Sequence, residues 1–141
     1  MANALYTEYK NGILGLPTHT WVDWNADDIK CVLVDHADDT PAPTTDVDLV
    51  DITTGSSLVA TSGNMASVTI GVVAGGVVDM ANFAFTTVTG DQCESLNWYK
   101  DSGTAATSPL ILYIDTATGL PVTPNGADIN VTLDPAGLFG F

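Results

Sequence analysis

The chain contains very few basic residues. Its 141 residues include three lysines and no arginine against 17 acidic residues, which gives a formal net charge of −14 at pH 7. Lys10, Lys30 and Lys100 are widely spaced in the sequence. Proteins bind phosphate groups and anionic lipids through clustered Lys and Arg side chains. The composition therefore argues against a nucleic acid or a membrane surface as the partner.

Long hydrophobic runs are missing as well. The longest are short stretches such as Leu110–Ile114, whereas a membrane-spanning helix needs about 20 consecutive apolar residues. The first ten residues, MANALYTEYK, lack the basic start and apolar stretch of a secretory signal. We therefore expect a chain that folds in a cytoplasm.

Cysteine is scarce, with only Cys31 and Cys93 in the chain. Two cysteines are too few for a disulfide framework, and their spacing matches no metal-binding motif. Each lies in a stretch typical of a β-strand, and free cysteines are among the most buried residues. We expect two buried, reduced thiols, with a 31–93 disulfide as the alternative.

Motifs of the common enzyme classes are absent. The sequence has no GxSxG elbow, P-loop, HExxH motif or glycine-rich dinucleotide fingerprint. The two histidines, His19 and His36, are expected in loops or at the surface. Either could join a catalytic triad only through tertiary contacts, which a sequence does not reveal. We expect a protein that is not an enzyme and needs no cofactor.

Aspartate is unusually frequent, which raises the question of calcium, because carboxylate oxygens are good ligands for this ion. Neither of the two densest groups matches the twelve-residue calcium loop with its glycine and closing glutamate. We therefore interpret both as solvated acidic loops without a metal. The groups are Asp35, Asp38 and Asp39, and Asp46, Asp48 and Asp51.

The N-terminal residues favour a short helix. Leu5, Tyr9 and Ile13 recur at four-residue spacing, which predicts a helix over Asn3–Leu14 with Asn3 as N-cap. Such a short helix is marginal alone and must dock on its own domain or on a neighbouring subunit. Residues 1–16 are therefore interpreted as an N-terminal helix or arm.

The rest of the chain has the pattern of a β-protein. Short apolar stretches alternate with turn pairs such as Asn125–Gly126, and no sustained helical period follows residue 30. We predict one mostly β domain over residues 1–141, with residues 17–141 forming an antiparallel β-sandwich or jelly-roll-like barrel. The expected strands cover residues 29–35, 49–52, 58–61, 67–73, 77–80, 83–88, 93–100, 110–115, 128–133 and 138–141.

Alternation within two segments predicts which side chains face the core. In residues 128–133, Ile129, Val131 and Leu133 should point one way and their neighbours the other. Leu110–Ile114 is apolar throughout, which suits a strand covered on both faces, or one with a face in a subunit contact.

Exposed aromatic residues could form a platform that stacks on carbohydrate. Trp98 alternates with Leu96 and is expected in the core. Trp21 and Trp24 are the better candidates for an exposed patch or a subunit contact.

The sharpest signal is in the C-terminal half. Residues 96–129 read LNWYKDSGTAATSPLILYIDTATGLPVTPNGADI. This segment resembles a family of small virion-associated proteins of tailed bacteriophages and prophages, although Ala127 stands where glycine is usual. Met1–Tyr6, Ile29–Asp35 and Phe85–Glu94 fit the same family pattern. The resemblance carries over no catalytic residue.

The resemblance implies a structural component of a phage particle. The first hypothesis is a capsid decoration (cement) protein that binds the major capsid protein on the outer capsid surface as a symmetric oligomer, most simply a trimer. The alternative is a tail, head-fibre or host-attachment module that binds a receptor or carbohydrate. Packaged DNA would repel a charge of −14, which favours an external position in the virion. The expected interface residues are Leu5, Tyr9, Ile13, Trp21, Trp24, Leu110, Leu112 and Ile114.

Overall fold

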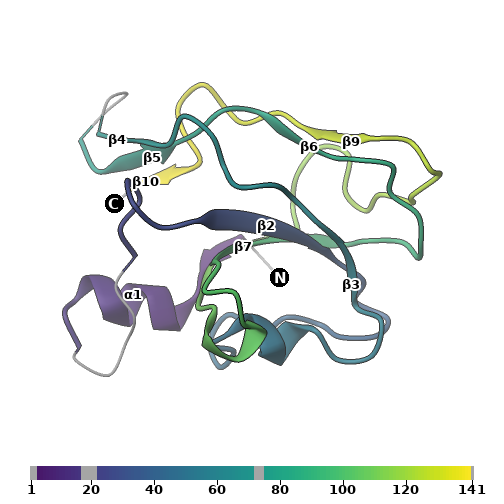
Figure 1. The fold of residues 1–141 in the computed structure, drawn as a ribbon, viewed down its shortest axis with the longest axis horizontal. Coiled ribbons are helices and arrows are strands. Elements are labelled where there is room, and N and C mark those ends of the chain that lie inside the picture. The colour runs from purple at the N-terminus through teal and green to yellow at the C-terminus, as the bar shows by residue number, and fades with distance from the viewer. Residues whose placement is uncertain (1–2, 17–21, 72–74, 141) are drawn as a thin grey trace.

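The computed structural model describes residues 3–16, 22–71 and 75–140, and the chain is arranged in three layers (Figure 1). An antiparallel sheet forms the middle layer, with smaller sheets above it and the helical segments below it. The mostly β, antiparallel fold with one short N-terminal helix is confirmed, and its layers are sandwich-like.

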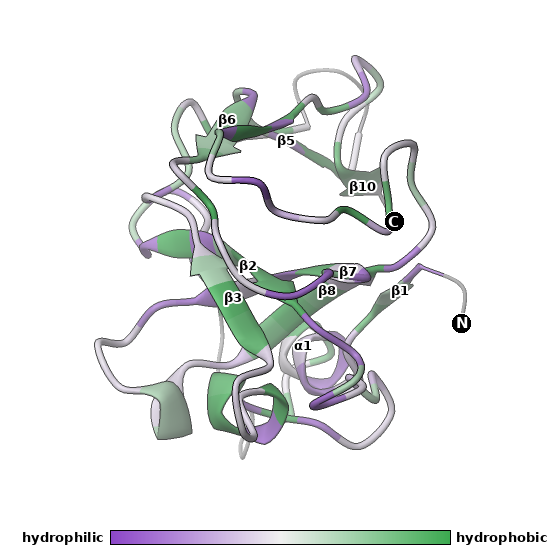
Figure 2. Cartoon of the chain, turned by 90° about the vertical axis from the view of Figure 1, so that its right-hand side faces the viewer, coloured by the Kyte–Doolittle hydropathy of each residue, from purple (hydrophilic) through white to green (hydrophobic). Residues whose placement is uncertain are grey.

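The middle sheet has the strand order β1-β8-β7-β2-β3. Among its strands, β2, β3 and β8 are mostly hydrophobic (Figure 2). Side chains on both faces are buried, as expected for apolar strands packed between two layers. The strands are β1 (Ala4–Leu5), β8 (Leu110–Ile114), β7 (Ser95–Lys100), β2 (Ile29–Val34) and β3 (Leu58–Thr61).

The layer above consists of two small antiparallel sheets. One has the order β10-β5-β4 and the other pairs β6 with β9. Phe85, Val78 and Met80 from this layer pack on Trp98 and Leu33 of the middle sheet, forming the larger hydrophobic core. The strands are β10 (Phe139–Gly140), β5 (Val77–Asp79), β4 (Thr69–Ile70), β6 (Phe83–Phe85) and β9 (Ile129–Val131).

The layer below contains α1 (Thr7–Ile13) and the 3-10 helices η1 (Leu49–Ile52) and η2 (Ala105–Thr107). A second core lies between η1 and the middle sheet, where Leu49 and Ile52 pack with Val32, Val34 and Tyr6. Both faces of the central strands are therefore covered by the chain itself.

The predicted helix over Asn3–Leu14 is too long at its N-terminus. The side chain of Asn3 does not cap a helix; its Oδ1 accepts hydrogen bonds from the backbone N–H groups of Asp115 and Thr116 at 3.1 and 3.0 Å. These bonds place the following residues beside β8, so that Leu5 lies in β1. The helix begins only at Thr7.

The predicted strand over residues 49–52 is wrong, because this segment is η1. Asp48 and Asp51 form a reciprocal capping box around its first turn, and Asp51 Oδ2 accepts from the backbone N–H of Asp48 at 3.0 Å. Capping by two aspartates thus outweighs the strand preference of the apolar residues between them.

Candidate functional site

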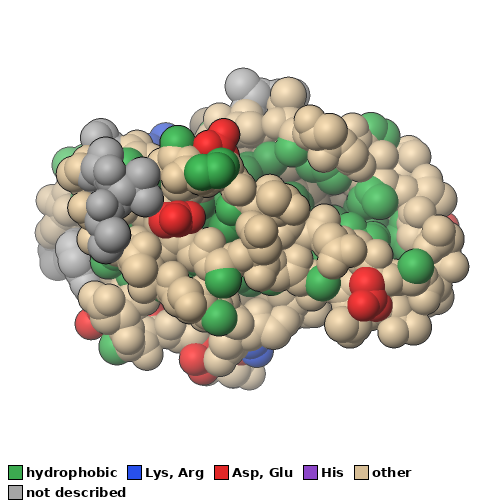
Figure 3. Space-filling view, turned by 90° about the horizontal axis from the view of Figure 1, so that it is seen from above, with side chains coloured by type: hydrophobic (Ala, Val, Ile, Leu, Met, Phe, Trp, Pro, Cys, Tyr) green, Lys and Arg blue, Asp and Glu red, His purple; other side chains and the backbone are tan. Residues whose placement is uncertain are grey.

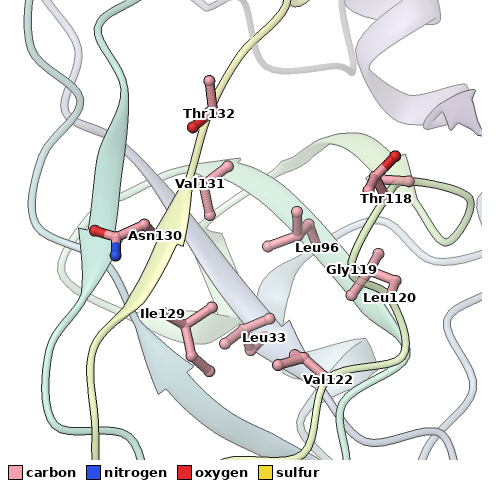
Figure 4. A pocket seen from close by; sticks show the side chains of 11 residues that line it. Leu33, Leu96, Thr118, Gly119, Leu120, Val122, Ile129, Asn130, Val131 and Thr132 are labelled. Carbon is pink, nitrogen blue, oxygen red and sulfur yellow. The ribbon is translucent and has the colours of Figure 1, made fainter.

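An open cavity of about 250 Å³ lies between β9 and residues 117–122. Leu33 of β2 and Leu96 of β7 form its floor (Figure 4). Viewed from above, the molecule is hollowed on the side of β6 and β9, and apolar side chains are visible inside the hollow (Figure 3). The upper layer therefore leaves an open space above Leu33 and Leu96, although these two side chains are themselves buried.

The lining of this cavity is mostly apolar and contains no charged residue. Ile129 and Val131 reach from β9 toward Leu33 and Leu96, and Val122 faces them from the other wall (Figure 4). The side chains of Asn130 and Thr132 point away from the cavity. Concave, mostly apolar hollows are the usual binding sites of proteins. We refer to this hollow, with the lining residues just named, as the groove.

A second hollow of about 330 Å³ adjoins the groove and shares Leu96, Ala117, Val131 and Thr132 with it. Its further lining is also mostly apolar, with Trp98 among the residues, and Asp134 is its one charged residue. Apolar surface thus extends beyond the C-terminal end of β9.

The β9 wall follows from the sequence alternation. Ile129, Val131 and Leu133 are half-buried, whereas Asp128 and Asn130 are exposed, as predicted. β9 pairs with β6 in antiparallel register, with Phe83 opposite Val131 and Phe85 opposite Ile129.

The opposite wall is fixed by an isolated bridge between Cys93 and Val122. The backbone N–H of each residue donates to the carbonyl of the other at 2.9 Å. A turn precedes the bridge, in which Leu120 N–H donates to the carbonyl of Ala117 at 3.1 Å. Gly119 has a φ of 95° in this turn, a conformation that favours glycine.

A buried polar network lies on the opposite face of the middle sheet. Tyr6 Oη donates to Asn97 Oδ1 at 2.7 Å, and Asn97 Nδ2 donates to Ser95 Oγ at 3.0 Å. Ser95 Oγ also lies 2.9 Å from His36 Nε2. Burial, together with the charges of nearby aspartates, raises the pKa of the Tyr6 hydroxyl. This phenol therefore stays protonated and acts as a hydrogen-bond donor.

The Ser95–His36 contact was not predicted from the sequence, and its geometry resembles half of a catalytic triad. A catalytic serine must be accessible to substrate, but Ser95 is fully buried. The imidazole of His36 stacks on Tyr113, with ring centroids 6.2 Å apart. The network is a structural element that joins β7 to Tyr6, which lies between β1 and α1, and to the loop after β2. His19 lies outside the described residues.

Both cysteines are free and buried, as predicted, and no 31–93 disulfide is present. Burial raises the pKa of the Cys31 thiol. Burial and the nearby Glu94 and Asp35 carboxylates raise the pKa of Cys93 to about 12. Because the thiolate is the reactive form, both thiols are protonated and unreactive at neutral pH.

Several of the predicted interface residues lie in the interior of the chain. Tyr9 and Trp24 are 5% and 7% exposed; Trp24 Nε1 donates to Tyr9 Oη at 2.9 Å, and both rings pack against Phe139. Leu110 and Leu112 are also buried, which agrees with a strand covered on both faces. These four side chains leave little surface for a partner.

The remaining predicted interface residues are more accessible. Leu5, Ile13 and Ile114 are half-buried, while Trp21 lies outside the described residues. Among the described residues, the exposed large apolar side chains are Leu14, Leu16, Val47, Val50 and Ile70, none of which was selected from the sequence. The sequence pattern therefore identified core positions better than surface positions. Trp98 is fully buried, as predicted.

Two of the three lysines form ion pairs with aspartates at one end of the middle sheet. Lys30 pairs with Asp101, and Lys100 Nζ lies 2.9 Å from Asp27 Oδ2. Within the described ranges, His, Cys, Asp and Glu side chains form no group of three or more that could hold a metal ion. Among the same residues, no helix is long and apolar enough to cross a membrane.

Comparison with protein-family models and with curated protein sequences finds no match for this chain.

Proposed function

We propose that this protein is a structural component of a phage particle, a decoration protein that binds the major capsid protein on the outer surface of the head. The observation that carries the proposal is the resemblance of residues 96–129 to small virion-associated proteins. In the fold these residues form β7, β8 and the 117–122 wall of the groove. The resemblance therefore concerns the central framework of the fold.

The distribution of charge supports an external position. The net charge is −14, and two of the three lysines are already paired with aspartates. Few positive groups are left to contact DNA, and the acidic surface would be repelled by packaged nucleic acid.

The burial of the tryptophans bears on the alternative, a carbohydrate-binding attachment module. Trp24 and Trp98 lie in the core and offer no stacking surface. A decoration protein needs only a shaped surface that fits the capsid, which is the kind of surface that the groove provides. We therefore favour decoration over carbohydrate recognition.

Binding to emptied heads tests the proposal. Heads of the phage or prophage that encodes the chain are stripped of this protein, mixed with the purified chain and sedimented. We expect saturable co-sedimentation, and a trimer by light scattering of the free protein. Heads of an unrelated phage are the control and should bind none. A monomer that never sediments with its own heads would contradict the proposal.

A further inference from the structure

We infer that the groove is a docking site for an extended segment of a partner protein, which adds as a strand to the free edge of β9. The segment would carry alternating apolar residues, with a basic residue at each end. That the partner is the major capsid protein rests on the proposed function, whereas the groove and its chemistry do not. Three features support this docking: the free edge of β9, the apolar floor beside it, and the carboxylates that flank it.

The first feature is an unpaired strand edge. Within the described part of the chain, β9 pairs with β6 alone. Leu133 N–H points to the β6 side, where it donates to Asn82 Oδ1 at 2.8 Å. Backbone groups of alternate residues point to opposite edges of a strand, so the N–H and C=O of Asn130 face the other edge. Asn130 lines the groove although its side chain points away, which agrees with this assignment.

The second feature is the apolar floor below that edge. A strand paired with β9 would lie about 4.8 Å from it, over the space that the groove leaves open. Its residues opposite Ile129 and Val131 would point down toward Leu33 and Leu96, and those between would point to solvent. This is strand addition, in which backbone hydrogen bonds give affinity and alternate side chains give specificity.

The third feature is a pair of carboxylates that flank β9: Asp128 directly precedes the strand, and Asp134 follows it after two intervening residues. Asp128 and Asp134 are exposed, and they lie on the same side of the alternation as Asn130. The sequence from 128 to 134 is DINVTLD, so a paired segment with Lys or Arg at both ends would place each cation opposite an aspartate. The groove lining itself contains no positive residue.

The same charges disfavour a second copy of this chain as the occupant. Another copy carries a charge of −14, and Lys30 and Lys100 are engaged in their own ion pairs. Like charges facing one another across an interface oppose binding. The partner is therefore a different protein with a basic, extended segment.

A synthetic peptide tests the inference directly. The probe is Lys-Val-Thr-Val-Thr-Val-Lys with blocked ends, and the control peptide has Glu in place of both Lys residues. Binding is followed by the amide signals of the isotope-labelled protein in NMR. We expect the Lys peptide to shift the amide signals of Asn130 and Thr132, to bind more weakly as salt is raised, and to outcompete the Glu peptide.

Matched variants distinguish backbone pairing at the free edge of β9 from binding through side-chain contacts alone. Asn130→Pro removes the N–H at the free edge, a position where edge strands tolerate proline, whereas Asn130→Ala keeps it. We expect affinity to fall about tenfold or more in the proline variant and to stay within about twofold in the alanine variant. Asp128→Asn and Asp134→Asn together should weaken binding and flatten its salt dependence. Each asparagine keeps the oxygen that accepts from Thr87 N–H or Ala136 N–H in the native chain.

The outcomes are decisive in both directions. Unshifted groove signals at about 1 mM peptide, equal binding of the Glu peptide, or equal binding by the two Asn130 variants would overturn the inference. If Asn130→Pro unfolds, as circular dichroism would show, the Asp128/Asp134 double variant decides. Peptide binding without binding to heads would refute the capsid proposal and leave the groove site standing. If all of these variants bind to heads as strongly as the parent protein does, the groove site is refuted and the capsid proposal stands.

Discussion

The Tyr6–Asn97 hydrogen bond gives a quantitative test of the lower core. The substitution Tyr6→Phe removes one oxygen and keeps the ring in place. Tyr6 and Asn97 are both fully buried, and their hydrogen bond spans 2.7 Å. Without the phenol, Asn97 Oδ1 is left in the interior without its donor.

The expected cost follows from the burial of that acceptor. Leaving a buried acceptor unsatisfied costs about 1–3 kcal/mol, so we expect a loss of about 2 kcal/mol in the free energy of unfolding. For a domain of this length, each kcal/mol lowers the melting temperature by about 3–4 °C. The variant should therefore melt about 6–8 °C below the parent protein.

Tyr113→Phe is the matched control. Tyr113 is also a buried ring, but its hydroxyl donates to Asp115 Oδ2 at 3.0 Å in a partly exposed position. Water can replace that donor, so we expect a loss below about 1 kcal/mol. Urea unfolding of the two variants and the parent measures the difference. Equal losses for Tyr6→Phe and Tyr113→Phe would refute the idea that the buried Tyr6–Asn97 hydrogen bond contributes more to the free energy of unfolding than the partly exposed Tyr113–Asp115 bond.

Three further outcomes are expected. Cys31 and Cys93 should react with Ellman's reagent only after denaturation, because both thiols are buried; fast reaction of the native protein would contradict this. Addition of EDTA should leave the melting temperature within about 2 °C, and a much larger fall would establish a structural cation. The hydrogen bond from Lys30 holds the pKa of Asp101 below its ordinary value, so the pair stabilises the fold at neutral pH and this contribution is lost as the pH falls through the lowered pKa. Lys30→Met should thus cost less than about 1 kcal/mol at pH 7 and progressively less as the pH is lowered through the acid range. A cost in urea unfolding that does not change with pH would contradict the ion pair as its cause.

Strong local patterns were enough to predict the central strands. Nearly every residue of β2 and β8 is buried, and the alternation of residues 128–133 correctly predicted which side chains of β9 face inward. In these segments the local preference and the tertiary environment agree, so the sequence pattern is a reliable guide.

Long-range contacts account for what the sequence did not reveal. Asn3 has the residue type of a helix cap, but it bonds backbone more than 100 positions away and leaves the helix to begin later. Trp24 was expected at the surface and is buried because Phe139, from the far end of the chain, covers it. The groove likewise depends on the gap between β9 and residues 117–122, which no local pattern encodes.

The copy number of this chain in purified particles tests the proposed function most directly. Virions or induced prophage particles are purified, and the chain is quantified against the major capsid protein by mass spectrometry with labelled standards. A decoration protein that occupies repeated capsid sites should be present at a fixed ratio to the major capsid protein, comparable to the number of those sites. A chain that is absent from the particle, or present in only a few copies, would contradict its assignment as a capsid decoration protein.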